Sequence, residues 1–411
     1  MEDHVIYPVD AHVHVYSSGA PPFPFVTSKP PPSLATASAD RLFSLMSEAQ
    51  VAGALIVQPI NFKFDHSYVA SVLADGRFEG RFRGMCLLDP HAGDDYLVKL
   101  KQQGFGSVRF NPYLFDEQPE VAQEEVTDEV LENNTDENDD EVIDNDGKER
   151  ENQKNVVGQV ATTQKNCDDE VDDATVTTAS SSSPSSSLSS RTTSASASST
   201  ATASTSQPSK PIVTMGGTRA IELFKQAGQL RMAVGFMCFK GLRHHFKDIV
   251  TLITASPDTN VIIDHWGFLK QNGTIEQESL DLLVSLAEFP IGSGQRSNVF
   301  VKLSAMFRNS LQPWPHADLV PIMQRLVKAF GAQRLIWATD YPWMCDYYRD
   351  GDDDDDDDTE GYATKAFVNE PLLQQCLKTK AERHAVLRGT AERLFGAWPA
   401  TPCPREEDML D

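Results

Sequence analysis

Short apolar, β-branched segments alternate with segments of helical periodicity along most of this chain, and this alternation restricts the fold more than any other feature. The strand-like segments are residues 5–10, 54–58, 82–88, 107–110, 232–237, 261–264, 300–303 and 335–339. The helix-like segments are residues 40–52, 96–103, 218–229, 247–255, 278–288 and 318–330, with a closing helix near 382–395. Eight strand–helix units within about 300 residues predict an α/β fold, a (β/α)8 barrel of the TIM type. The alternative is a doubly wound open sheet, but no glycine-rich phosphate loop follows the first strand-like segment.

Two acidic stretches interrupt this pattern. The chain has 60 acidic residues against 36 lysines and arginines, a formal net charge of −24. Residues 116–211 hold 22 acidic and 6 basic residues and no Phe, Tyr or Trp, so they cannot bury enough surface to offset their ordering entropy. Residues 350–360 hold nine more acidic residues. We therefore expect one barrel, formed by residues 1–115 and 212–400, with disordered acidic inserts after the fourth and eighth strands and a flexible acidic tail at 401–411.

Composition also narrows the functional classes. The negative charge argues against nucleic-acid binding, and no apolar run is long enough to span a bilayer. The N-terminus lacks the basic start and apolar core of a signal peptide, so a cytoplasmic protein is expected. The six cysteines form no C-x-x-C pair, which favours a reducing compartment over a disulfide framework. The expected partner is a small-molecule substrate, and the insert at 116–211 could bind a basic protein.

Polar and titratable residues gather where the strand-like segments end. The ends read Asp10-Ala11-His12-Val13-His14, Arg109-Phe110-Asn111, Asp264-His265-Trp266, Lys302-Leu303-Ser304 and Thr339-Asp340-Tyr341. In a (β/α)8 barrel the carboxyl ends of all strands meet on one face, and active sites are built there. The sequence therefore predicts an active site on that face.

Histidine and aspartate residues among these ends suit hydrolytic chemistry. His12 and His14 are two residues apart, so on a strand both point the same way and can share a metal ion or a substrate oxygen. Asp340 is the candidate general base, because a carboxylate can activate water and return the proton to a leaving oxygen; the alternative is a helix cap. His265 is a candidate to polarise a carbonyl or to bind a metal. The alternative is a core histidine whose hydrogen bonds are satisfied within the protein. Its neighbour Asp264 is expected to point the opposite way.

Arginine residues suggest an acidic substrate. Arg109 and Arg308 suit carboxylate recognition, because a guanidinium group binds a carboxylate bidentately and stays charged. The alternative for both is a salt bridge on the barrel rim. Asn111 is expected to orient Arg109 or to bind the substrate itself.

Six motifs resemble those of a known superfamily. They are VDAHVH at 9–14, GSVRFN at 106–111, VIIDHWG at 261–267, VKLSAMFR at 301–308, LIWATDYP at 335–342 and LRGTAERLF at 387–395. Together they resemble the amidohydrolase superfamily, in particular the amidohydrolase-2 group that includes 2-pyrone-4,6-dicarboxylate lactonase and related sugar lactonases. The resemblance implies a hydrolase that opens a lactone or a similar carboxylate-bearing molecule. The implied residues are Asp340 as the base, His12, His14 and His265 against the carbonyl, and Arg109 and Arg308 on acidic substituents.

The metal ligands of many superfamily members are incomplete here. The fifth strand-like segment, 232–237, carries no histidine, and the fourth ends in Arg109 rather than lysine, so a binuclear centre is not expected. A single zinc or manganese ion would use His12, His14 and Asp340. The lactonase that the motifs resemble works without one, and we expect no obligatory metal. Cys238 could replace the missing histidine, although a small core residue is the simpler interpretation.

Two alternatives to lactone hydrolysis stay open. One is a decarboxylase or hydratase of the same superfamily. The other is a catalytically degenerate barrel that acts as a scaffold through its acidic insert.

Overall fold

The computed structural model describes residues 5–27, 29–30, 37–115, 212–289, 298–347, 362 and 371–404. All of them belong to one compact unit, Met1–Glu137 with Pro211–Asp411, and the second unit, Asn138–Lys210, lies outside the described residues. The predicted insert at 116–211 and the Asp-rich stretch at 350–360 also lie outside them.

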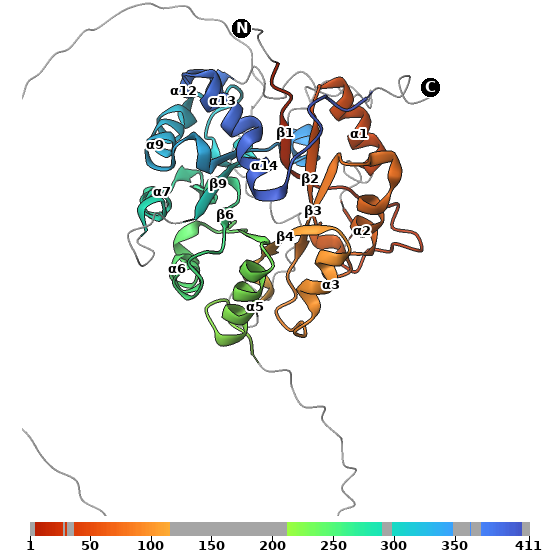
Figure 1. The fold of residues 1–411 in the computed structure, drawn as a ribbon. Coiled ribbons are helices and arrows are strands. Elements are labelled where there is room, and N and C mark those ends of the chain that lie inside the picture. Colours follow the sequence, from red (N-terminus) through yellow and green to blue (C-terminus); the bar gives the residue numbers. More distant parts are fainter. Residues whose placement is uncertain are drawn as a thin grey trace, which may run out of the picture. The chain divides into compact units, whose positions relative to one another are not determined.

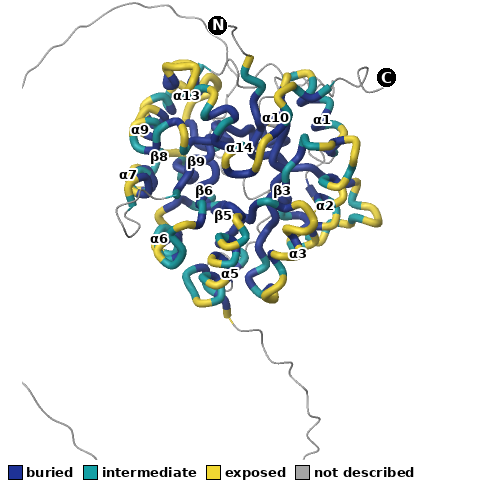
Figure 2. Tube along the Cα trace, viewed as in Figure 1, coloured by how far each residue is buried: buried dark blue, intermediate teal, exposed yellow. Residues whose placement is uncertain are grey.

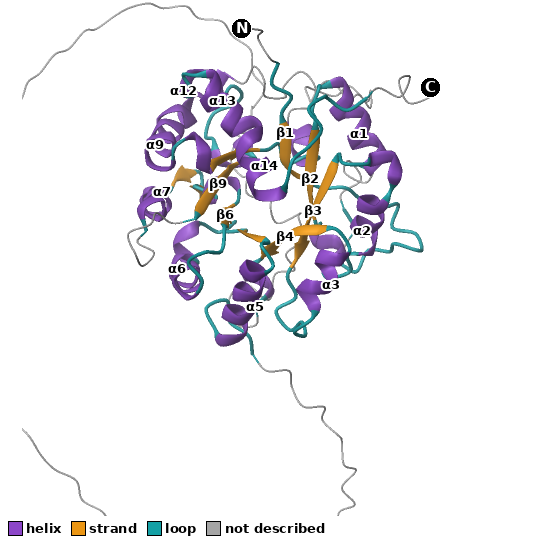
Figure 3. Cartoon of the chain, viewed as in Figure 1, coloured by secondary structure: helices purple, strands orange, loops and turns teal. Residues whose placement is uncertain are grey.

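A ring of parallel strands surrounded by helices forms the centre of the described structure (Figure 3). Within the described residues, eight strands pair in the order β1-β2-β3-β4-β5-β6-β9-β10. They are β1 (Val9–Val13), β2 (Gly53–Val57), β3 (Phe82–Leu87), β4 (Phe105–Phe110), β5 (Ala233–Phe236), β6 (Val261–Ile263), β9 (Val299–Leu303) and β10 (Leu335–Trp337). A short antiparallel hairpin, β7 (Lys270–Gln271) and β8 (Thr274–Ile275), follows β6. The predicted (β/α)8 barrel is confirmed, and the open-sheet alternative is wrong.

The ring closes between its first and last strands just beyond the end of β10. Val13 and Tyr341 form an isolated parallel bridge there. The His14 amide donates to the Tyr341 carbonyl at 2.7 Å, and the Asp340 amide donates to the His12 carbonyl at 3.0 Å. The seam between β1 and the segment after β10 therefore holds three predicted site residues side by side.

Helices pack around the ring and across one end of it (Figure 1). They are α1 (Ala39–Glu48), α2 (Ser67–Ala74), α3 (Tyr96–Gln102), α5 (Thr218–Gln229), α6 (Phe246–Ala255), α7 (Gln277–Ser285), α8 (Met306–Asn309), α9 (Val320–Phe330), α10 (Trp343–Tyr347), α12 (Pro371–Cys376), α13 (Lys380–His384) and α14 (Thr390–Phe395). Each amphipathic helix buries the apolar stripe that its sequence period predicts, as Ala220, Leu223, Phe224 and Ala227 of α5 do. The closing helix predicted near 382–395 is α13 and α14 joined by a π-helical turn, Ala385–Gly389.

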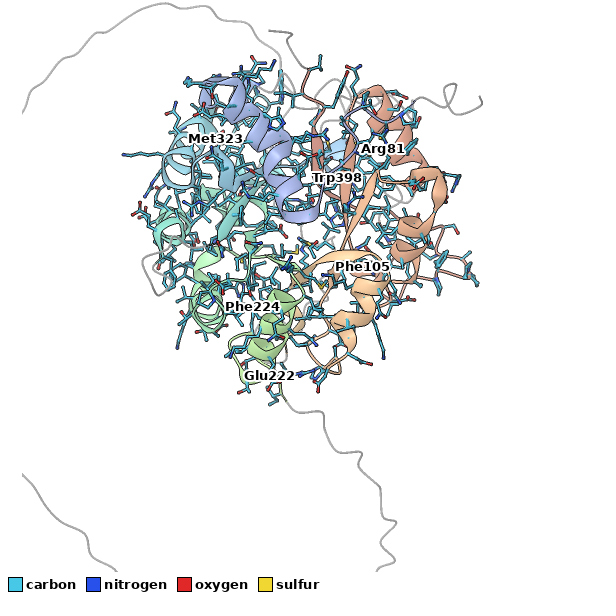
Figure 4. All side chains as sticks on the ribbon, viewed as in Figure 1. Arg81, Phe105, Glu222, Phe224, Met323 and Trp398 are labelled. Atoms are coloured by element: carbon cyan, nitrogen blue, oxygen red, sulfur yellow. The ribbon has the colours of Figure 1, made fainter. Side chains whose placement is uncertain are left out.

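The core has two layers, and burial is concentrated in the strands (Figure 2). The outer layer packs the helices against the strands, whereas the inner layer fills the barrel. The inner layer consists of Val9, Ala11, Leu55, Val57, Met85, Ala233, Ile262, Phe300, Ile336, Ala338, Ala391, Leu394, Phe395 and Trp398. Because this layer joins α14 and Trp398 to strand residues, the closing helix seals the amino-terminal end of the barrel. Figure 4 labels Trp398 and Arg81, and the indole nitrogen of Trp398 donates to the Arg81 carbonyl at 3.0 Å.

Two boundaries differ from the sequence prediction. The first strand begins at Val9 rather than at residue 5 and runs through His12 to Val13. At the other end, the chain stays packed on the barrel beyond residue 400, since Cys403 is buried and its amide donates to the Val51 carbonyl at 3.0 Å. In the described part of the chain, no helix combines the length and the apolarity needed to cross a bilayer.

Candidate active site

A β-bulge in β1 aims the two histidines of the HVH motif into the barrel. Asp10 lies opposite Ala54 and Val13 opposite Ile56, so β1 has one residue more than β2 over this interval. Accordingly Ala11 packs in the inner layer and Val13 in the outer layer, although a regular strand would place both on one face. The bulge thus reverses the alternation and brings His12 and His14 to the carboxyl-terminal mouth of the barrel.

Three histidines and one carboxylate meet at this mouth. The Nε2 atoms of His12 and His14 are 3.3 Å apart. The Oδ1 atom of Asp340 lies 3.7 Å from Nε2 of His12, 3.8 Å from Nε2 of His14 and 3.9 Å from Nε2 of His265. All four residues are buried, with Asp340 only 3% exposed. The structure therefore brings together the four residues that the sequence proposed as catalytic.

A second carboxylate, Asp10, holds the Asp340 segment in place. Asp340 has a positive φ of 71°, which is unfavourable for a residue with a side chain. The preceding Thr339 donates to Asp10 twice, from its amide at 2.9 Å and from its hydroxyl at 2.6 Å. The His12 amide and the Tyr362 hydroxyl donate to the same carboxylate, at 3.3 and 3.2 Å. Asp10 is fully buried, and that burial raises its pKa to about 6.

Asp264 lies on the same side as the site, and the expectation that it points away is wrong. Its Oδ2 accepts from Nε of Arg109 at 3.1 Å, and its Oδ1 lies 2.9 Å from Nζ of Lys302. Ile262 belongs to the inner layer, so regular alternation turns Asp264 inward. His265 would then face outward, but its positive φ of 48° ends the alternation and swings it to the same side.

His265 is anchored from two strands. Its Nδ1 is 2.8 Å from the Ser304 hydroxyl, beyond the end of β9, and its Nε2 is 3.5 Å from a terminal guanidinium nitrogen of Arg109. Ser304 and Lys302 alternate with outer-layer residues of β9, so both face the barrel interior. Sequence reasoning noted both at a strand end but assigned neither a role, because the signal that distinguishes them is burial beside a partner from another strand.

The two arginines meet carboxylates of the protein itself. Arg109 is buried against Asp264, whereas Arg308 places its Nε 3.3 Å from Oδ2 of Asp340. The Cζ atom of the Arg308 guanidinium also lies 5.0 Å from the centre of the Phe307 ring and 5.1 Å from that of Trp343, within the range of cation–π contacts. Each guanidinium carries further N–H groups that these contacts do not use. A role in binding a substrate carboxylate remains a prediction for both.

Two further residues from the sequence analysis have structural roles. Asn111 is buried, and its side-chain oxygen accepts from the Tyr113 amide at 3.2 Å, capping the short helical turn Pro112–Leu114. Cys238 packs in the outer layer of the core, and burial raises the pKa of its thiol. Its place in that layer agrees with the interpretation as a small core residue.

Burial keeps the site histidines neutral at neutral pH. It lowers the pKa of His14 to about 3, and the nearby Arg109 adds to the effect. Burial also lowers the pKa of His12 and of His265 far below the ordinary value, with the charges of Lys302 and Arg109 acting in the same direction. The imidazoles therefore act as neutral hydrogen-bonding groups.

Three of these residues offer donor atoms to a metal ion. Ligand atoms of His12, His14 and Asp340 lie within 4.8 Å of one another, a spacing that a single cation could bridge. His14 also has the partner that a metal-bound imidazole needs, because its Nδ1 bonds to the Val57 carbonyl at 2.9 Å. His12 does not, because its Nδ1 faces Nζ of Lys302 at 3.1 Å, and an ammonium group has no acceptor. As arranged, this donor set does not fit a metal ion.

Comparisons with known proteins place this geometry in context. The sequence model of the amidohydrolase family matches residues 213–397. Among curated protein sequences, none matches this chain.

Solved structures share its fold. A Pseudomonas putida protein described as a candidate 2-pyrone-4,6-dicarboxylic acid hydrolase has a TM-score of 0.52 and 18% identity, covering 95% of this chain and 98% of its own. A similarly described Acinetobacter baumannii protein with citric acid bound has a TM-score of 0.52 and 13% identity, covering 95% and 100%. A Burkholderia multivorans amidohydrolase with bound zinc has a TM-score of 0.52 and 16% identity, covering 95% and 99%. At sequence identities this low, the similarity shows a shared fold alone.

Proposed function

We propose that this chain, whose residues 213–397 match the sequence model of the amidohydrolase family, hydrolyses a lactone carrying an acidic substituent. The observation that carries the proposal is the position of Asp340. Its carboxylate lies among three neutral imidazoles at the carboxyl-terminal mouth of the barrel, with one oxygen toward the histidines and the other toward Arg308.

Asp340 is suited to act as the general base. The Arg308 guanidinium beside Oδ2 favours the ionised carboxylate, which can accept a proton from water. The neutral histidines do not compete for that proton, because their pKa values are lowered by burial. Loss of a general base typically lowers the rate of an enzyme about 10²–10⁴-fold.

The reaction needs no reactant besides the lactone and water. Water oxygen bonds to the lactone carbonyl carbon while its proton passes to Asp340, and the carbonyl oxygen gains negative charge. The imidazole cluster and the cationic side chains around it stabilise that charge. The ring carbon–oxygen bond then breaks, and the ring oxygen receives the proton from Asp340. The product is the open-chain hydroxy acid.

The arginines of the site favour an anionic substrate. Lys302, Arg109 and Arg308 bring three positive charges, the carboxylates of Asp264, Asp340 and Asp10 balance them, and the histidines are neutral. Each guanidinium group still has N–H groups that its contact with a protein carboxylate does not use, and these can bind a substrate carboxylate. The dicarboxylic lactone in the names of two structural neighbours, and the citric acid bound to one of them, support the same substrate class.

Proton release from a panel of lactones tests the proposal. The panel should contain pyrone dicarboxylates and sugar-acid lactones with their uncharged counterparts, each assayed with and without a strong chelator. We expect turnover of an acidic lactone that survives the chelator and produces one proton per ring opened. Release of carbon dioxide from aromatic acids, with every lactone inert, would overturn hydrolysis in favour of a decarboxylase.

A further inference from the structure

Lys302 is a buried cation in the barrel interior, and the proposed reaction gives it no role beyond its charge. It lies on β9 and is fully inaccessible to solvent. Its Nζ atom lies between two groups from other strands, 2.9 Å from Oδ1 of Asp264 and 3.1 Å from Nδ1 of His12. An ammonium group buried this deeply is retained only where its protons have partners.

The hydrogen-bonding groups around Nζ of Lys302 determine which ring nitrogen of His12 carries the proton. An ammonium group only donates, and an ionised carboxylate only accepts. Lys302 therefore forms an ion pair with Asp264 and donates to His12, so Nδ1 of His12 must be the acceptor. A neutral imidazole carries a single proton, so the proton of His12 is on Nε2, the atom that faces His14 and Asp340.

The other two histidines have the opposite arrangement at the site. Nδ1 of His14 contacts the Val57 carbonyl, which only accepts, so His14 carries its proton there and presents a bare Nε2. Nε2 of His265 faces the Arg109 guanidinium, which only donates, so the His265 proton is on Nδ1 toward Ser304. Among these three histidines, His12 is thus the one that presents an N–H group to the substrate.

We propose that Lys302 is a positioning residue that holds His12 in its Nε2–H tautomer. This inference rests on the proposed function, in which His12 then donates the hydrogen bond to the developing oxyanion. It also explains the poor fit of a metal ion, because a protonated Nε2 has no lone pair for a cation. Without Lys302, His12 can move its proton to Nδ1 and donate it to Asp264, whose Oδ1 lies 3.8 Å away.

Nitrogen NMR of the imidazole rings reads the tautomer directly. In ¹⁵N-labelled full-length protein, we expect His12 to show a protonated Nε2 and a bare Nδ1, with its signals identified by their loss in H12Q. A protonated Nδ1 on His12 in the wild-type protein would overturn the proposal. This measurement needs neither a substrate nor a Lys302 variant.

Zinc binding gives a second readout. K302M should bind zinc at least tenfold more tightly than wild type by titration calorimetry, and its His12 signals should shift to the Nδ1–H form. K302R keeps a donor beside Nδ1 and should stay like wild type, as should K99M, which makes the same change at an exposed lysine. Equal zinc affinity in wild type and K302M would contradict the proposal, and near-UV circular dichroism identifies a variant that has not folded.

The two proposals can fail separately. If no lactone is hydrolysed but His12 is an Nε2–H tautomer that depends on Lys302, only the proposed function fails. If acidic lactones are hydrolysed but the tautomer is the opposite one, the assignment to Lys302 fails alone.

Discussion

The two ends of the barrel are closed by different kinds of interaction. At the amino-terminal end, α14 and Trp398 pack apolar side chains against strand residues such as Val9 and Phe300. At the carboxyl-terminal end, the interior holds buried charges, imidazoles and hydrogen bonds. One end is a packed hydrophobic core, and the other is a network of buried ion pairs and hydrogen bonds.

Backbone strain occurs at both ends. Ala305, Asp340 and His265, which follow strands at the carboxyl-terminal end, have positive φ angles. Gln50 and Arg231, which precede β2 and β5 at the amino-terminal end, have them as well. Such conformations cost about 1–3 kcal/mol each and persist only where surrounding contacts enforce them. At Asp340 these contacts are the two hydrogen bonds that the preceding Thr339 donates to Asp10.

The largest expected effect is on catalysis. D340N keeps the size of the side chain but removes the base, so kcat on an acidic lactone should fall about 10²–10⁴-fold with little change in thermal stability. D281N is the matched control, because Asp281 is an exposed carboxylate on α7 paired with Arg325. Wild-type turnover by D340N would show that the carboxyl-terminal end works by another base.

The next effect is on folding and concerns the amino-terminal end. W398A removes a buried indole and its hydrogen bond to Arg81, so the free energy of unfolding should fall by about 3–5 kcal/mol. The kcat of the molecules that remain folded should be unchanged. W314A, at a tryptophan that is 45% exposed, serves as the control for urea unfolding. A large loss of kcat in folded W398A would mean that the two ends are not independent.

Acid should destabilise the protein through its buried histidines. Burial lowers the pKa of His14 to about 3 and of His66 and His245 to about 4, so in the unfolded chain each takes up a proton at a higher pH than in the folded protein. Their contribution is complete above pH 6.5 and is lost as the pH falls below it, by about 2 kcal/mol per histidine at pH 5. The pKa of Asp10 is instead raised to about 6, so the folded protein takes up this proton before the unfolded chain does. Asp10 therefore offsets about 1 kcal/mol of the loss of stability at pH 5.

Urea unfolding at pH 7.5 and pH 5 measures this loss. In H66Q the glutamine oxygen can still accept from the Leu87 amide, as Nε2 of His66 does at 3.1 Å. The variant should therefore lose about 2 kcal/mol less than wild type between the two pH values. Equal losses in both proteins would contradict the assignment of a neutral His66.

The smallest expected effect tests close packing at the amino-terminal end. A Cβ at Gly53 would lie 2.0 Å from Cδ1 of Trp398 and 2.6 Å from the Arg81 carbonyl oxygen. G53A should therefore reduce the free energy of unfolding by about 1–3 kcal/mol. G76A is the control, because no atom lies within 4 Å of a Cβ there. Equal stability of the two variants would mean that both Trp398 and the Arg81 backbone can shift without cost.

Much of the fold was predictable because apolar strand segments and amphipathic helices carry their own periodicity. The segment 218–229 was predicted with the bounds that α5 has, since its apolar stripe is regular. The first strand was misplaced, because residues 5–8 are as apolar as the true strand and only pairing with β2 decides where β1 begins. Asp264 was misassigned, because the prediction took His265 as the inward residue and applied alternation from there.

The local sequence set the eight strand–helix units and the polar residues at their ends, because hydrophobic period and residue type act over a few neighbouring positions. Tertiary structure decided which of those residues meet. The bulge that aims His12 and His14, and the contact of Lys302 with His12 and Asp264, depend on strands that lie far apart in the chain. A hydrogen-bonding partner, and with it the tautomer of a histidine, is a property of that assembled neighbourhood.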